Sequence, residues 1–144
     1  MWFNPFMAGV LRSPFHGLLS HNTMLITVCG KKTGRRLTTP VNYFRRGDEL
    51  LMVSLRSRTW WRNLRGGAQV GLLLAGKERE AFASVAESDS EIVRGLAQII
   101  VHSPSIASPL AIALDETGRP KPADLARASQ NRVIVRARLK PLPS

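Results

Sequence analysis

Short apolar segments rich in β-branched and aromatic residues, separated by glycine-containing turns, fill much of the first two thirds of the chain. This composition is typical of β-strands. Three segments are predicted as strands in this way, Met24–Cys29, Leu37–Phe44 and Glu49–Leu55, and two more, Gln69–Ala75 and Lys77–Val85, are predicted to pair around Gly76. The turns Arg45–Asp48 and Gly76 join neighbouring segments closely enough to predict two hairpins. Pro40 marks an edge or a bulge in its strand because proline has no N–H to donate.

A sixth strand is predicted near the C-terminal end. In Arg132–Leu139, apolar residues at every second position alternate with mostly basic ones. A strand of this kind buries one face and keeps the other polar. We therefore expect the residues Val133, Val135, Ala137 and Leu139 to point into a core.

Helical periodicity appears in three places. Ser88 and Glu91 form a capping box that opens a helix over 88–102, with apolar residues at helical spacing. Pro122–Ser129 predicts a short helix. The N-terminal residues 1–21 predict a helical segment with a break or kink at Pro14.

These elements predict the fold class. About six mostly antiparallel strands with short helices indicate an α+β protein built on a small β-barrel, not a doubly wound parallel sheet. The length of 144 residues fits a single domain, 1–144, with the helix 88–102 inserted before the last strand.

Charge is concentrated in the first half. The formal net charge is +11, and residues 1–67 contain eleven of the 21 Lys and Arg but only two of the ten acidic residues. A field of this sign suits nucleic acid, an anionic membrane surface or an acidic small molecule. The chain has no helix-turn-helix, zinc or RNA-recognition signature, so we expect no nucleic-acid partner.

Metal and disulfide chemistry find no support. The single Cys29 lies at the end of an apolar strand and is expected to be a small core residue. His16, His21 and His102 have no partner at metal-ligand spacing, so no metal site is predicted. No signal peptide or membrane-spanning segment is evident, and we expect a cytoplasmic protein, with peripheral membrane contact through the N-terminal helix left open.

The segment Gly30–Val41 is the strongest functional signal. Two glycines bracket Lys31, Lys32 and Thr33, and two arginines follow directly. Sharp turns at the glycines are expected to expose N–H groups, and the side chains add cations around them. The segment is therefore predicted to hold an anionic group.

The turn Thr59–Arg65 is the second signal. Thr59 is expected to cap one or two helical turns that Gly66 and Gly67 end. Adjacent residues cannot share one helical face, so at least one of Trp60 and Trp61 should lie at a boundary, where an indole can pack on a ring system.

The ordered motifs from Gly30 to about Val70 resemble those of the deazaflavin-dependent nitroreductase family. They are the basic Thr-Gly-Arg loop, the Thr-Pro-Val-Asn-Tyr strand, the Gly-Asp hairpin and the Trp-Trp-Arg-Asn-Leu turn. The resemblance implies a split β-barrel of the FMN-binding-like type and the deazaflavin coenzyme F-420 as cofactor. It also implies an oxidoreductase that passes a hydride to a small electrophile such as a quinone, an enone or a nitro compound.

The resemblance assigns cofactor contacts to particular positions. The phosphate and acidic tail would lie on the basic loop, the ring against two strands, and the tryptophan turn over the cofactor. The residues carried over are Lys31, Lys32, Thr33, Gly34, Arg35, Arg36, Thr39, Pro40, Val41, Ser54, Leu55, Arg56, Trp60, Trp61, Asn63 and Arg65.

The sequence leaves the source of the proton open. The cofactor carries the hydride chemistry, so no obligatory catalytic residue is predicted, with Tyr43 and Ser54 as possible proton donors. Tyr43 is the only tyrosine, whereas family members that reduce bulky nitro compounds have several.

FMN is the alternative cofactor. The alternative functions are a non-catalytic FMN- or haem-binding module and the binding of nucleic acid or an anionic membrane. The partner would be a small-molecule electron acceptor, and the protein a monomer or homodimer.

Overall fold

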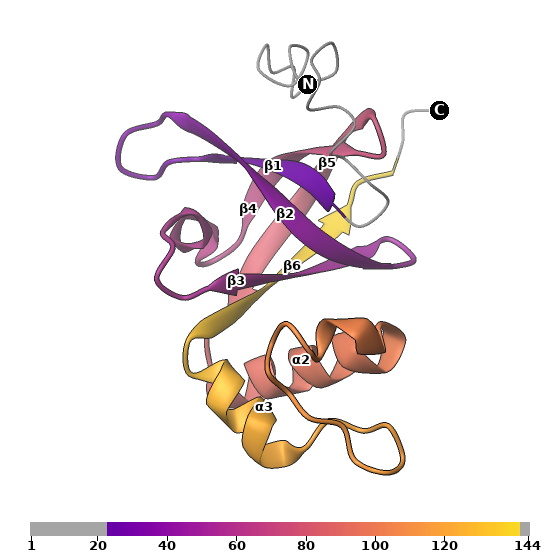
Figure 1. Ribbon diagram of the computed structural model, residues 1–144. Helices are drawn as coiled ribbons and strands as arrows, with labels where there is room; N and C mark the ends of the chain where they lie inside the picture. The colour runs from indigo at the N-terminus through magenta and orange to yellow at the C-terminus, as the bar shows by residue number, and fades with distance from the viewer. Residues whose placement is uncertain (1–22, 142–144) are drawn as a thin grey trace.

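The protein consists of a β-barrel with a layer of helices packed against its outside (Figure 1). This computed structural model describes residues 23–141, so the expected helical segment 1–21 lies outside the described part. The elements in chain order are β1 (Thr23–Cys29), β2 (Arg36–Arg46), β3 (Glu49–Leu55), the 3-10 helix η2 (Trp60–Leu64), β4 (Ala68–Leu74), β5 (Lys77–Ala86), α2 (Asp89–His102), the 3-10 helix η3 (Pro104–Ile106), α3 (Pro122–Ser129) and β6 (Arg132–Leu139).

The barrel is closed, with strand order β1-β2-β3-β6-β5-β4 and β4 pairing back to β1. Every neighbouring pair is antiparallel. Closure gives each strand a neighbour on both sides over at least part of its length, which leaves less exposed edge than an open sheet has. The predicted α+β class and six-stranded antiparallel barrel are confirmed.

Alternation along β6 separates two hydrophobic cores. Val133, Val135, Ala137 and Leu139 are buried inside the barrel, as their spacing predicts. Ile134 points to the other side and joins the core between barrel and helices. One strand thus serves both layers because successive side chains lie on opposite faces of a sheet.

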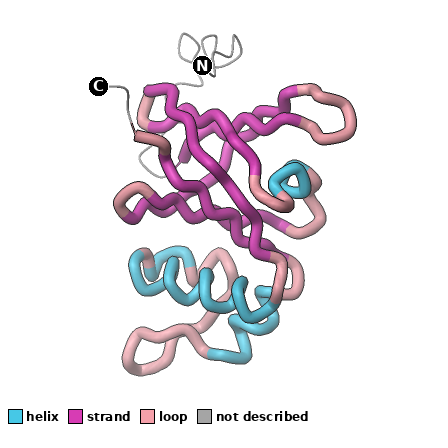
Figure 2. The backbone as a smooth tube through the Cα atoms, turned by 180° about the vertical axis from the view of Figure 1, so that it is seen from behind, coloured by secondary structure: helices cyan, strands magenta, loops and turns pink. Residues whose placement is uncertain are grey.

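The helical layer packs on one side of the barrel, as seen from both directions (Figures 1 and 2). Ser88 caps α2: its hydroxyl accepts from the N–H of Glu91 at 3.4 Å and bonds the Glu91 carboxylate at 2.9 Å. Gly95 allows α2 to approach β6 closely, because a Cβ at this position would lie 3.0 Å from Cγ1 of Ile134.

Three local predictions are wrong. Cys29 is exposed, because it is the last residue of β1, where the strand leaves the barrel core. Trp60 and Trp61 are both buried, at 5% and 1% exposure, because η2 is enclosed by β1, β5 and the barrel core and not laid on a flat surface. Thr59 occupies the N-cap position but its side chain makes no capping hydrogen bond.

Candidate cofactor site

The barrel splits open between β2 and β3. The two strands pair from Arg46 opposite Glu49 as far as Tyr43 opposite Met52. Beyond that point, among the described strands, β2 pairs with β1 alone and β3 with β6 alone. Pro40 lies in this part of β2, where one missing N–H is tolerated because the second edge has no strand beside it. The divergence leaves the backbone of both strands accessible along one edge.

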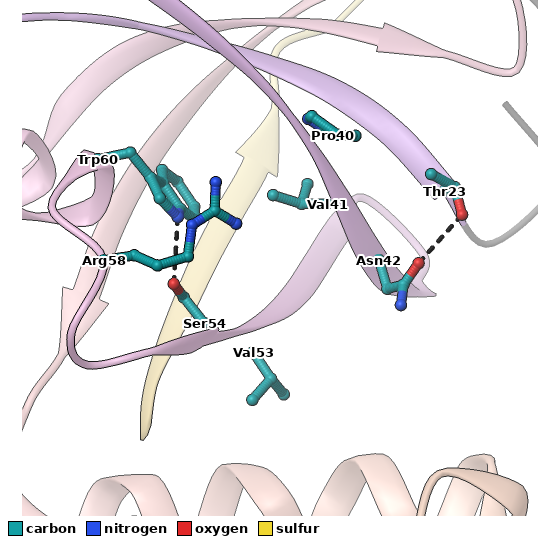
Figure 3. A pocket seen from close by; sticks show the side chains of 8 residues that line it. All are labelled: Thr23, Pro40, Val41, Asn42, Val53, Ser54, Arg58 and Trp60. Carbon is teal, nitrogen blue, oxygen red and sulfur yellow. Dashed lines mark hydrogen bonds between the residues drawn. The ribbon is translucent and has the colours of Figure 1, made fainter. Parts of the chain in front are cut away.

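A hollow of about 230 Å³ lies in this split (Figure 3). Its walls come from the start of β1, the free stretch of β2, the end of β3 and the segment leading into η2. The lining residues are Thr23, Pro40, Val41, Asn42, Val53, Ser54, Arg58 and Trp60. Half of the lining residues are apolar and half are polar or charged, so the hollow combines apolar surface with polar groups that can orient a ligand.

Polar contacts hold the far wall of the hollow in place. The indole Nε1 of Trp60 donates to the hydroxyl of Ser54 at 3.1 Å, and this hydroxyl donates to its neighbouring carbonyl, that of Leu55, at 3.2 Å (Figure 3 shows the first bond). Arg58 reaches across the split and donates from Nη2 to the hydroxyl of Thr39 at 2.8 Å. The Ser54 proton is therefore already engaged, and Arg58 brings a positive charge to the hollow.

The structure brings some of the predicted residues to the hollow and leaves Arg56 outside it. Pro40, Val41, Ser54 and Trp60 line the hollow. Arg56 does not: its Nη2 donates to the backbone carbonyls of Glu87, Ser129 and Arg132 at 3.2–3.4 Å. These bonds tie the end of β3 to the helical layer, which is a structural role.

Tyr43 lies among the buried residues of the barrel core. Burial raises the pKa of its phenol, and the nearby charge of Arg45 offsets part of the rise. The phenol thus stays protonated, but Tyr43 is not a lining residue of the hollow.

Four lining residues were missed by the sequence prediction: Thr23, Asn42, Val53 and Arg58. Thr23 and Asn42 are strand partners, and the Thr23 hydroxyl donates to Oδ1 of Asn42 at 3.0 Å. Strand register brings these two residues together, and no local sequence motif predicts that contact. Arg58 could have been predicted from the sequence, since it lies two residues before Trp60 in a basic segment.

Three of the six backbone N–H groups of the basic loop 30–35 donate within the loop. Gly30 N donates to the Arg35 carbonyl at 2.7 Å, Gly34 N to the Gly30 carbonyl at 2.8 Å, and Arg35 N to the Thr33 hydroxyl at 3.2 Å. Gly34 has a positive φ of 70°, which favours glycine. The N–H groups of Gly30, Gly34 and Arg35 are therefore occupied, so an anion would be bound by the side chains of the loop and by its remaining N–H groups.

The loop is held against η2. Lys31 N donates to Oδ1 of Asn63 at 3.1 Å, and Lys31 Nζ donates to the carbonyl of Arg65. Asn63 also donates from Nδ2 to the Trp60 carbonyl at 3.1 Å, so its amide is bonded at both ends. These bonds place the basic loop next to the turn whose first residue, Trp60, lines the hollow.

Positive charge at this end of the molecule is largely uncompensated. The guanidiniums of Arg62 and Arg65 lie 5.6 Å and 5.2 Å from the ring centroid of Trp61. Within residues 23–141, the ion pairs involve Arg65, Arg127, Arg136 and Lys140. Lys32, Arg35 and Arg58 are exposed and take part in none of them.

Glu87 is the acidic residue paired at this end, and its titration gives a prediction. Arg65 binds it through two bonds of 2.8 Å and 3.0 Å, which lowers the pKa of the Glu87 carboxyl below its ordinary 4.5. A lowered pKa stabilises the fold above the ordinary value, and the contribution is lost as pH falls through the lowered one. We expect Glu87→Gln to be slightly less stable than the wild type at pH 7, with the difference vanishing in acid.

The measurement is urea unfolding of both proteins across the acidic range. The pair is substantially exposed, so the difference in the free energy of unfolding should be small. A difference that stays constant with pH would show that the carboxylate charge is not what stabilises this contact.

Among the described residues, no helix is long and apolar enough to cross a membrane, and no group of three or more metal-binding side chains occurs. The chain matches no curated protein at a significant level.

Comparison with solved structures supports the fold. A Listeria innocua structure, provisionally assigned as a pyridoxamine 5′-phosphate oxidase, is 12% identical, with a TM-score of 0.55 over 95% of this chain and 93% of that one. The heme storage protein HutZ from Vibrio cholerae is 16% identical, with a TM-score of 0.53 over 100% and 93%. Identities this low establish a shared split-barrel architecture and nothing about ligands.

The sequence itself identifies the family. Residues 12–108 match the model of the family described as F420H(2)-dependent quinone reductase. The match spans β1 to the start of the segment after η3, and so includes the basic loop, the split and the tryptophan turn. This chain therefore belongs to the F420H(2)-dependent quinone reductase family.

Proposed function

We propose that the protein is an oxidoreductase that binds reduced F-420 in the split between β2 and β3 and transfers a hydride to a small electrophile such as a quinone, an enone or a nitro compound. The observation that carries this proposal is a lined hollow beside the exposed cations Lys32, Arg35 and Arg58, which form no ion pair with another residue of 23–141. A redox cofactor with a flat ring and an acidic tail needs both features. Family membership supports the choice of F-420 over other flavin-like groups.

The residues present fit such a group in two ways. Pro40, Val41 and Val53 offer apolar surface for a ring, and the unpaired edges of β2 and β3 offer backbone groups for its polar rim. Lys32 and Arg35 are exposed on the loop next to η2, where charge-assisted hydrogen bonds to phosphate or carboxylate can form. The hollow is small, so we expect the tail to lie outside it on the loop.

In this reaction the protein's own residues bind and orient the cofactor. The bound cofactor supplies the hydride. Trp60 and Ser54 hold one wall in a fixed position, and Arg58 places a positive charge beside the hollow, where it can stabilise negative charge that develops on an acceptor. The Ser54 hydroxyl is engaged and Tyr43 is buried, so we expect water to supply the proton that completes the reduction.

The direct test is fluorescence titration of the full chain with oxidised F-420, followed by assay of the reduced cofactor with menadione as the quinone. We expect saturable binding at micromolar concentration and quinone-dependent oxidation of the cofactor. FMN is the comparison ligand, because the fold is shared with proteins of other chemistry. FMN binding tighter than F-420, or no F-420 binding at micromolar concentration, would contradict the proposal.

A further inference from the structure

A second and larger cavity lies between the barrel and the helical layer. It has a volume of about 760 Å³, within the range of small-molecule sites. Residues 42–46 of β2 form one wall, and the C-terminal end of α2 with η3 and Pro109 forms the other. In Figure 1 the β2–β3 hairpin lies above these helical segments. Its lining residues are Asn42, Tyr43, Phe44, Arg45, Arg46, His102, Ser103, Ser105, Ile106 and Pro109.

Charge in this cavity is positive. Arg45 donates from Nε to the Gly47 carbonyl at 2.9 Å, which leaves its two Nη groups for other partners. Neither Arg45 nor Arg46 takes part in an ion pair within the described residues. Glu49 is the cross-strand partner of Arg46 and does not line the cavity, and its carboxylate is bound to Arg136 at 3.3 Å.

A small recess of about 30 Å³ adjoins this cavity and shares four of its residues, Phe44, Arg45, Arg46 and His102. Gln98 lines the recess, and its Oε1 is buried without a hydrogen-bond partner in the described structure. A buried acceptor left unpaired is costly, and a donor from a ligand or water would satisfy it. An ionised carboxylate has no proton to donate to this oxygen, so the recess would hold a water or a hydroxyl, and the case for an anion rests on the two arginines of the cavity.

Apolar surface completes the cavity. Phe44 and Ile106 are partly buried against the core between barrel and helices, and Pro109 lies beside them on the wall. A ligand that satisfies this lining has an anionic head for the two arginines and an apolar body for these side chains.

We propose that this cavity is a second ligand site, specific for an amphipathic anion, a carboxylate or phosphate carried on an apolar chain or ring. The two arginines of this cavity do not line the hollow between β2 and β3, and Asn42 is the only lining residue that the two sites share. Binding here does not depend on the identity of the cofactor, so it can be tested on the full chain without F-420.

The test is isothermal titration calorimetry of the full chain with dodecanoate and dodecyl phosphate below their micelle concentrations. Dodecanol and inorganic phosphate are the partial ligands, one without the charge and one without the chain. We expect both amphipathic anions to bind and to bind at least tenfold tighter than either partial ligand, since a charge-assisted bond is worth about tenfold or more. Dodecanol binding as tightly as dodecanoate would overturn the role of the arginines, and inorganic phosphate binding as tightly as dodecyl phosphate would overturn the role of the apolar wall.

Three variants locate the site. Arg46→Ala should weaken dodecanoate binding about tenfold or more, whereas Arg94→Ala, which removes an exposed charge of α2 away from the cavity lining, should leave it unchanged. Ser105→Trp should abolish binding by filling the cavity from an exposed position, with an unchanged unfolding midpoint as evidence that the fold is intact. Equal losses in Arg46→Ala and Arg94→Ala, or full binding by Ser105→Trp, would contradict the assignment.

Discussion

Replacing Lys32 and Arg35 together with alanine should weaken the binding of oxidised F-420 by about 100-fold, since each charge-assisted bond to phosphate or carboxylate contributes about 1.5–3 kcal/mol and both side chains are exposed, which favours the lower value. The loop's backbone should stay intact, because the bonds that shape it involve Gly30, Gly34, the Thr33 hydroxyl and the amide of Lys31. Fluorescence titration measures the change directly.

Salt dependence separates a specific charge contact from general loss of affinity. Added salt should weaken wild-type binding strongly and the double variant much less, because the screened charges are gone. The matched control is Arg94→Ala with Arg119→Ala, which removes two exposed charges from the helical side of the molecule. If this control loses as much affinity as the loop variant, net charge and not the loop holds the cofactor.

Replacing Trp61 with alanine should destabilise the protein by about 3–5 kcal/mol, the usual cost of emptying a buried aromatic site. Trp61 is 1% exposed and lies in the barrel core, and its ring supports the guanidiniums of Arg62 and Arg65. A loss of this size is a large share of the roughly 5–15 kcal/mol that a domain typically has, so the unfolding midpoint should fall markedly. Urea unfolding followed by circular dichroism gives the free-energy change.

Trp61→Phe is the informative companion variant. The indole Nε1 of Trp61 is buried and has no hydrogen-bond partner in the part of the chain that the structure describes, so phenylalanine removes an unsatisfied donor while keeping most of the apolar ring. It should cost much less than alanine. The equivalent change Trp60→Phe removes a donor that bonds Ser54 and leaves that hydroxyl short of a partner, so it should cost more than Trp61→Phe. The reverse order would contradict the role assigned to the two indoles.

Local patterns were sufficient for the strands and for the main helix. The alternation in β6 predicted which side chains enter the barrel, because a strand with one buried face must place apolar residues at every second position. The Ser88–Glu91 box predicted the start of α2, because capping depends on residues three apart in the chain. Both signals are complete within a few residues of sequence.

Predictions that depended on the surroundings were wrong. Burial of Cys29 was inferred from its apolar strand, but the strand ends there and its side chain meets solvent. The rule that adjacent tryptophans cannot share a face assumed a helix lying on a surface. In the barrel, η2 is enclosed on several sides and both rings are buried.

By itself, the sequence determined the strand set, the basic loop and the family to which they belong, since each depends on residues close together in the chain. Only the tertiary structure decided where the barrel splits, because strand pairing between distant segments sets the point at which β2 and β3 diverge. It also decided which arginine faces the hollow. Arg56 and Arg58 are two residues apart, yet backbone carbonyls from Glu87, Ser129 and Arg132 bind the first, while the second crosses the split to Thr39.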